Sequence, residues 1–113
     1  MKTSIIYLFI LSLCVTLMTP FLSEANANGK AIFDTKCVAC HTIGQGKRIG
    51  PDLKGVTKKR EISWIKKMIK DPTAMLQSDP IAKQLLKEHN NVPMIPMGLS
   101  DSEINAVVEY LKK

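Results

Sequence analysis

Apolar side chains recur at helical spacing in several parts of the chain, and they predict an all-α protein. Between positions 62 and 69, four apolar residues stand three or four positions apart and share one face of a helix: Ile62, Ile65, Met68 and Ile69. This helix must end by Asp71, because Pro72 disfavours a helical conformation in the residue before it.

A further helix is predicted by its first two residues. Asp79 followed by Pro80 combines an N-cap side chain with a proline at the first helical position. The helix is expected to bury Ile81 and Leu85, with Ala82 as a further candidate, and to end near His89. At that end we expect His89 to be exposed to solvent, where a cation is favoured by the helix dipole.

The two ends of the folded part are also predicted to be helical. A short helix is expected from Asn28 to about Lys36, and the glycine-rich stretch 42–57 is expected to be loop. Ser100 and Glu103 form a capping-box pattern, in which each side chain bonds the backbone N–H at the other's position. They open a last helix with one apolar stripe, which consists of Ile104, Val107, Val108 and Leu111.

The first residues have the pattern of a secretory leader rather than of a domain. The range 5–18 is largely apolar, Pro20 interrupts it, and small residues precede a cleavage position after Ala27. We therefore expect a signal peptide at 1–27 and one mature domain at 28–113. An uncleaved membrane anchor is the alternative, although a span needs about 20 apolar residues and this run is shorter.

Size and composition narrow the class of protein. The chain has 113 residues, a formal charge of +6 and only 3 cysteines, which excludes large multidomain enzymes, collagen and disulfide scaffolds. After the leader, the aromatic residues are Phe33, Trp64 and Tyr110 alone. So few large side chains make a core without another apolar body marginal at this size.

The two cysteines that remain after cleavage lie in Cys37-Val38-Ala39-Cys40-His41. This spacing occurs in redox dithiols, in zinc sites and in covalent haem attachment. A zinc site needs further ligands nearby, and no strand pattern of a thioredoxin-like unit precedes Cys37. On a helical turn the three side chains share one face, so both thiols can bond a porphyrin while His41 reaches the iron. The pentad therefore favours haem.

With this motif the chain resembles the class I c-type cytochromes, from about Asn28 to Lys113. The matching features are the pentad, the run Gly50-Pro51-Asp52-Leu53-Lys54-Gly55-Val56, Trp64 in a helix, a methionine in a proline-containing loop and a final helix ending Tyr110-Leu111. The resemblance implies a small all-α cytochrome c fold, with four to five short helices around one covalently bound haem c.

The resemblance also implies roles for single residues. Cys37 and Cys40 are implied to carry the haem, His41 to bind its iron, and Pro51 to accept a hydrogen bond from the other nitrogen of His41. Gly29 is implied to let the first and last helices cross closely, with Phe33 and Tyr110 packed at the crossing.

The second iron ligand decides the chemistry, because an open position would allow small molecules to bind. In the family it is a methionine shortly before the final helix with a proline directly after it. Met94 fits best, but Pro96 comes one residue late, so Met97 remains a competitor and His89 a further one.

Two other methionines are expected to have structural surroundings instead. Met68 lies on the apolar stripe of its helix and is expected in the core. Met75 is expected in a turn between two helices, either in the core or at the surface.

Basic residues are concentrated between positions 47 and 70, where only Asp52 and Glu61 oppose them. They are Lys47, Arg48, Lys54, Lys58, Lys59, Arg60, Lys66, Lys67 and Lys70. The cluster is consistent with docking to an acidic redox protein, and equally with a solvated helix face. Nucleic acid is not an expected partner for an exported chain, and membrane association is expected only if the leader is uncleaved.

These features together predict an electron carrier, periplasmic or otherwise exported, with a His41- and Met94-ligated haem in a respiratory or related chain. No acid/base pair, nucleophile or phosphate-binding loop appears, so we expect no catalytic residue. Two alternatives stay open: a fixed haem subunit of a larger oxidoreductase, and a gas-binding haem protein with a labile sixth ligand.

Overall fold

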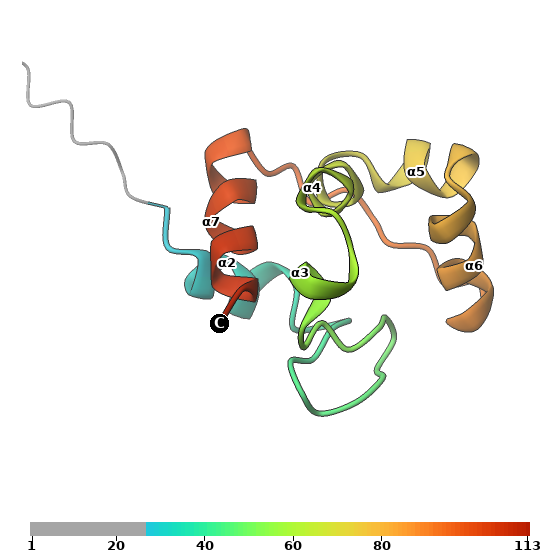
Figure 1. Ribbon diagram of the computed structural model, residues 1–113, viewed down its shortest axis with the longest axis horizontal. Coiled ribbons are helices and arrows are strands. Elements are labelled where there is room, and N and C mark those ends of the chain that lie inside the picture. The colour runs from blue at the N-terminus through green and yellow to red at the C-terminus, as the bar shows by residue number, and fades with distance from the viewer. Residues whose placement is uncertain (1–26) are drawn as a thin grey trace, which may run out of the picture.

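The computed structural model describes residues 27–113, and this part of the chain contains helices and loops without strands. The leader predicted at 1–27 lies outside the described residues, apart from Ala27. The helices are α2 (Gly29–Lys36), α3 (Val56–Lys59), α4 (Ile62–Lys70), α5 (Pro72–Ser78), α6 (Pro80–Glu88) and α7 (Asp101–Leu111) (Figure 1). The all-α prediction is confirmed.

The described residues contain six helices, where four to five were expected. The four-residue α3 begins in the last two residues of the expected loop 42–57, extends two residues beyond it, and is too short to show a period. The turn expected around Met75 is helix α5, so that prediction is wrong. Asp71 caps α5 by accepting from the Ala74 N–H at 3.0 Å, with Pro72 following it, in the same way as Asp79 and Pro80 begin α6.

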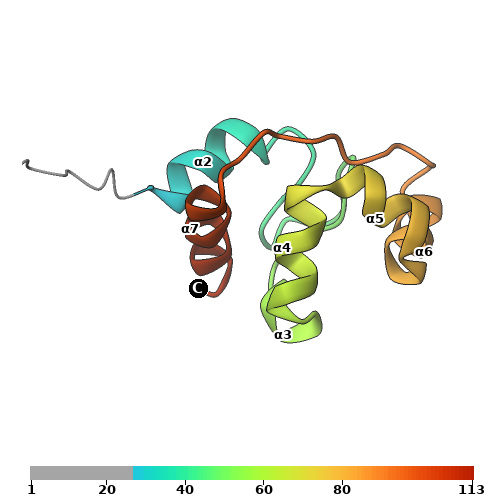
Figure 2. The same ribbon diagram turned by 90° about the horizontal axis from the view of Figure 1, so that it is seen from above.

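The crossing of α2 and α7 organises one half of the molecule (Figure 2). A Cβ atom on Gly29 would lie 2.0 Å from the Ala106 carbonyl oxygen, so only glycine allows this approach. The rings of Phe33 and Tyr110 pack beside it, with their centroids 5.6 Å apart. The crossing implied by the family resemblance is confirmed.

The protein core lies between α2, α4 and α7. Its buried residues are Phe33, Ile65, Leu99, Ile104, Val107, Val108 and Leu111. The capping box of α7 is present as predicted, because Ser100 accepts from the Glu103 N–H and Glu103 accepts from the Ser100 N–H. Leu99, next to the cap, is buried in the same cluster as Ile104, as a hydrophobic staple requires.

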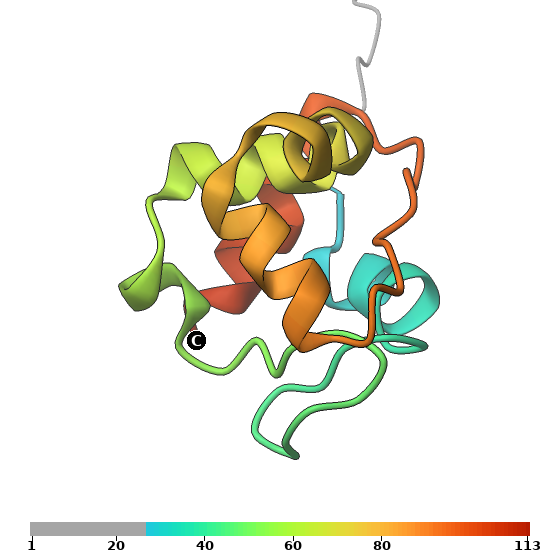
Figure 3. The same cartoon turned by 90° about the vertical axis from the view of Figure 1, so that its right-hand side faces the viewer.

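Helices α5 and α6 form an arm beside this core. They pack against each other, and α5 also contacts α4, while α6 stands away from α2 and α7 (Figure 1). Seen from the α6 side, the glycine-rich loop passes below the C-terminal end of α6 (Figure 3). The Lys47 ammonium group donates to the Glu88 carbonyl there and joins the two segments.

None of the helices in the range 27–113 is long and apolar enough to cross a membrane.

Candidate functional site

Cys37, Cys40 and His41 lie on one turn that continues from α2. The Cys37 N–H donates to the Phe33 carbonyl at 2.9 Å, and the His41 N–H donates to the Cys37 carbonyl at the same distance. Both thiols are free and half-buried. Burial and the neighbouring Cys40 raise the pKa of the Cys37 thiol. The turn therefore presents two thiols and one imidazole together, as the spacing of the pentad predicts.

The imidazole of His41 is oriented by Pro51. Its Nδ1 lies 2.9 Å from the Pro51 carbonyl oxygen, which can only accept, so the proton is on Nδ1. Burial lowers the pKa of His41; the Pro51 carbonyl opposes this shift and the nearby His89 adds to it. Among the described residues Nε2 has no hydrogen-bond partner. The ring is thus a neutral imidazole whose Nε2 lone pair is available to a metal.

Gly50 forms a cradle for the same ring. A Cβ atom at this position would lie 2.6 Å from Cε1 and 2.9 Å from Nδ1 of His41. The Gly50 N–H donates to the Cys40 carbonyl at 2.7 Å, and the Leu53 N–H donates to the Thr42 carbonyl at 2.8 Å. These two bonds flank the pair of His41 and Pro51, so the glycine-rich loop is held against the attachment turn on both sides.

The candidate sixth ligands have different surroundings. Met97 is half-buried and packs against the core cluster, whereas Met94 is half-buried and is not part of that contact set. Met68, expected in the core, is half-buried and lies outside the core cluster, so that expectation is wrong. Met75 is half-buried in α5.

His89 is buried, with 8% of its surface exposed, so the prediction of an exposed side chain is wrong. It does lie at the end of α6, as its C-cap. Asn90 and Asn91 then adopt left-handed conformations that turn the chain back. The His89 Nδ1–H donates to the Leu85 carbonyl at 2.8 Å, which satisfies a polar group of the buried ring within its own helix.

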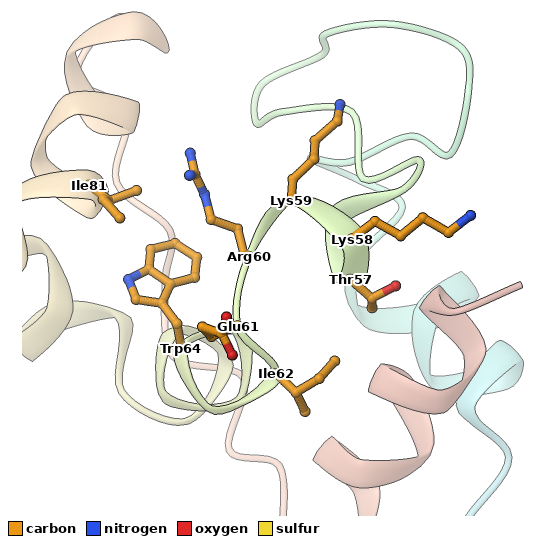
Figure 4. Close-up of a pocket in the computed structure, with 8 residues that line it drawn as sticks. All are labelled: Thr57, Lys58, Lys59, Arg60, Glu61, Ile62, Trp64 and Ile81. Atoms are coloured by element: carbon orange, nitrogen blue, oxygen red, sulfur yellow. The ribbon is translucent and has the colours of Figure 1, made fainter.

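A second candidate site, which the sequence analysis did not identify, lies between α3, α4 and α6. A pocket of about 320 Å³ is lined by Thr57, Lys58, Lys59, Arg60, Glu61, Ile62, Trp64 and Ile81 (Figure 4). The Arg60 guanidinium lies 5.8 Å from the centre of the Trp64 ring. The indole Nε1–H of Trp64 is buried and has no hydrogen-bond partner.

A buried donor without a partner is costly. The acceptor on the chain nearest in effect is the Asp79 carboxylate, whose pKa is lowered most by the Ala82 N–H. Trp64 and the Arg60 charge both help to lower the pKa of that carboxyl. The sequence signal that could have found this site is the single tryptophan four positions after a run of basic residues, Lys58 to Arg60, a spacing of about one helical turn.

Several apolar side chains also lack a protein core to pack against. Met68, Met75, Leu76, Ile81, Leu85, Leu86 and Met94 are half-buried, and all lie outside the cluster formed by α2, α4 and α7. A large apolar group would cover such side chains. The cradle at Gly50, the free Nε2 of His41 and these uncovered apolar side chains therefore fit a haem.

A zinc site at the two cysteines is not supported. Within the range 27–113, no group of three or more His, Cys, Asp or Glu side chains is arranged to hold a metal ion. An iron held by a porphyrin does not require such a group, because the porphyrin supplies most of the ligands.

Comparison with known proteins gives a consistent result. The sequence profile of the cytochrome c family matches residues 26–113, while no curated protein matches. A cytochrome c from Rhodothermus marinus is 38% identical, with a TM-score of 0.71 over 74% of this chain and 71% of that one. The cytochrome c domain of the pp3183 protein from Pseudomonas putida is 38% identical, with a TM-score of 0.67 over 75% and 85%.

An engineered form of the Rhodothermus marinus cytochrome, in a structure with a bound carbene intermediate, is 37% identical with a TM-score of 0.66. It covers 74% of this chain and 70% of its own. The family match extends over most of the chain and the structural matches over three quarters of it. The chain belongs to the cytochrome c family, whose small all-helical members transfer electrons by means of a covalently bound haem c.

Proposed function

We propose that the protein is an exported electron carrier in a respiratory or related redox chain, with one haem c attached through Cys37 and Cys40. In this proposal His41 and Met94 bind the iron. The observation that carries it is the His41 ring, which lies beside two free thiols with Nδ1 bonded to Pro51 and Nε2 unpartnered.

The assignment of His41 depends on the tautomer. A metal-bound imidazole needs its second nitrogen protonated and held, because that bond orients the ring and strengthens it as a ligand. Pro51 provides the acceptor at 2.9 Å, and Gly50 provides the space for the ring. His89, in contrast, uses its own Nδ1–H within α6.

Met94 is favoured over Met97 by their different packing. Met97 contacts the core cluster and already has a structural role, while Met94 is half-buried without one. Pro93 and Pro96 flank Met94 and restrict the backbone, which helps to keep one side chain in place.

Trp64 and Arg60 are proposed to bind the acidic groups of the haem. The Nε1–H is buried and the guanidinium beside it supplies a positive charge, and both groups also act on the Asp79 carboxylate. This pair would orient the cofactor and reduce the cost of holding carboxylates next to apolar side chains.

The chain's contribution to electron transfer is then positioning and tuning. The haem iron supplies the one-electron redox chemistry when it is bound. A neutral thioether from Met94 favours ferrous iron, and apolar surroundings disfavour the extra charge of the ferric form. Because both oxidation states would keep the same ligands, little needs to move when the electron passes.

We also propose that the carrier docks to an acidic surface on its redox partners. Lys58, Lys59 and Arg60 line the pocket near the proposed haem carboxylates and so extend the basic region to this edge. Lys70 is already paired with Asp101 at 2.7 Å, and Lys47 bonds the end of α6. We therefore expect the other basic residues between positions 47 and 70 to make most of the contacts with the partner.

Export through a cleaved leader at 1–27 completes the proposal, because two thiols that must be joined to haem are suited to maturation outside the cytoplasm. Mass spectrometry of the mature protein should find Asn28 as its first residue. A retained Met1 would instead make the leader an anchor and place the carrier at a membrane.

The function is tested by visible spectra of the purified protein in both oxidation states. We expect pigment that acidic acetone does not extract, and a weak red band of ferric iron bound to sulfur. Extractable pigment would exclude attachment through Cys37 and Cys40. Rapid carbon monoxide binding to the reduced form, without the red band, would exclude a stable methionine ligand.

A further inference from the structure

The carboxylate of Asp52 is held by three backbone N–H groups of the glycine-rich loop. Oδ1 accepts from Gly44 and Lys54, and Oδ2 accepts from Gly46, each at 2.8 Å. Gly44 and Gly46 have φ values of 84° and 86°, in the left-handed region that favours glycine. These conformations turn the N–H groups of Gly44 and Gly46 toward one carboxylate, so the loop makes an anion-binding concavity, or nest, that its own Asp52 occupies.

This nest lies in the segment that orients His41. Asp52 directly follows Pro51, whose carbonyl accepts from the His41 Nδ1–H. The loop also closes through Thr42, whose hydroxyl donates to the Gly46 carbonyl at 2.5 Å and whose own carbonyl accepts from Leu53. Without the carboxylate, the hydrogen bonds that join Gly44 and Gly46 to the segment containing Pro51 would be lost.

The charge on Asp52 is retained over the whole physiological range. The three N–H donors, of Gly44, Lys54 and Gly46 in order of effect, lower its carboxyl pKa from 3.8 to about 2. The Lys54 ammonium group adds to the same shift. A permanent anion thus stands one residue from the group that accepts from the proposed iron ligand.

We propose that Asp52 is a positioning residue that keeps the Pro51 carbonyl on His41 and thereby lowers the reduction potential of the haem. This inference rests on the proposed ligation by His41. A strong Nδ1–H bond makes the imidazole a better electron donor, which stabilises ferric iron. The negative charge stabilises the ferric form as well, so both effects lower the potential, and removal of the carboxylate raises it.

The test compares the holoprotein with its Asp52→Asn variant. The amide keeps one acceptor oxygen but loses the charge and the second acceptor. Asp34→Asn is the matched control, because Asp34 is an exposed carboxylate paired with Lys30 at 2.5 Å on the outer side of α2. Midpoint potentials are measured at low and high salt, together with hydrogen exchange of the loop amides and the NMR signal of the His41 Nδ1 proton.

For Asp52→Asn we expect a higher potential than in the control, with the difference retained at high salt because a local bond is not screened. The Gly44 and Gly46 amides should exchange about tenfold faster or more, as when a hydrogen bond to a charged group is lost. The Nδ1 proton signal should shift in this variant and not in Asp34→Asn.

A change in midpoint potential equal to that of Asp34→Asn, or one abolished by salt, would overturn the proposal. It would mean that Asp52 acts on the haem only through its charge. Unchanged exchange of the loop amides would also overturn it. If Asp52→Asn does not yield holoprotein, Asp52→Glu takes its place, since it keeps the charge but displaces both oxygens by one methylene. The wild-type spectrum tests the ligation by itself, so failure of the proposed function is distinguished from failure of this inference.

Discussion

Gly50 lies directly against the imidazole of His41. A Cβ atom at position 50 would come within 2.6 Å of Cε1, closer than side-chain atoms approach one another. The ring therefore packs against the backbone at Gly50, and its Nδ1–H donates to the Pro51 carbonyl. The two residues are nine positions apart, and the hydrogen bond from the Gly50 N–H to the Cys40 carbonyl brings them together.

Substitution Gly50→Ala is expected to displace the His41 ring and to destabilise the holoprotein by about 1–3 kcal/mol, as overpacking does. The red band of the ferric protein should weaken, because the ring can no longer lie in its present orientation. Gly55→Ala is the control for the red band: nothing lies within 4 Å of its Cβ position, so it should lose stability through backbone strain at a φ of 69° without changing the band. An unchanged red band and unfolding midpoint in Gly50→Ala would show that the cradle has no role.

Replacement of the two loop methionines is expected to have different effects. Met94→Ala should lose the red band and bind carbon monoxide when reduced, because the sixth position opens. Met97→Ala should keep the band and lose stability, by less than the about 2–5 kcal/mol of a fully buried methionine, because it removes a core contact. Visible spectra and urea unfolding measure the two effects. The reverse pattern would make Met97 the ligand.

Substitution Gly29→Ala tests the crossing of α2 and α7. The added methyl group would meet the Ala106 carbonyl at 2.0 Å, so the helices must separate. We expect the free energy of unfolding to fall by about 1–3 kcal/mol or more, with an unchanged denaturant slope. Lys36→Ala, on the exposed side of the same helix, should stay within about 0.5 kcal/mol of wild type. Equal effects of the two substitutions would contradict the close crossing.

Stability in acid should depend on Asp52. Its carboxyl pKa is lowered from 3.8 to about 2 in the folded protein, so its contribution is fully present above 3.8 and is lost as the pH falls toward 2. The wild type should therefore exceed Asp52→Asn in free energy of unfolding at pH 5 to 7, and the difference should shrink below about pH 4. Urea titrations across this range measure it. A difference independent of pH would mean that the ionised carboxylate is not what stabilises the loop.

Docking to an acidic partner predicts salt-dependent kinetics. Charge reversal of Lys58 and Lys59, which line the pocket between α3 and α4, should slow reduction by an acidic partner at low salt. High salt should slow the wild type and reduce its advantage over this variant. Lys113→Glu, at the C-terminus and outside the pocket lining, serves as a control with the same charge change per site. Rates that do not respond to salt would favour the solvated-face interpretation of the basic residues.

The local signals in the sequence were reliable wherever one or two neighbouring residues decide the structure. The capping box at Ser100 and Glu103 and the N-cap at Asp79 are present as predicted. Asp71 with Pro72 carries the same signal as Asp79 with Pro80, and helix α5 could have been predicted from it. The apolar pattern alone does not predict this helix, because the stretch between the two prolines is short and has no clear apolar period.

The surroundings of single side chains were less predictable. His89 was expected in solvent because a polar residue at a helix end is ordinarily exposed, yet its ring is buried and bonded to Leu85. Met68 shares a helix face with Ile65 in sequence, but only Ile65 belongs to the core. In both cases the outcome depends on which segment packs opposite, and neighbouring residues carry no information about that.

The sequence by itself determined the helical class, the ends of most helices, and the turn that presents Cys37, Cys40 and His41, since these depend on contacts within four or five residues. Only the tertiary structure decided that Gly50 underlies His41, that Asp52 gathers three N–H groups, and that Met97 rather than Met94 packs on the core. Those relationships join segments that loops bring together, and their geometry follows from how the helices pack rather than from any local pattern.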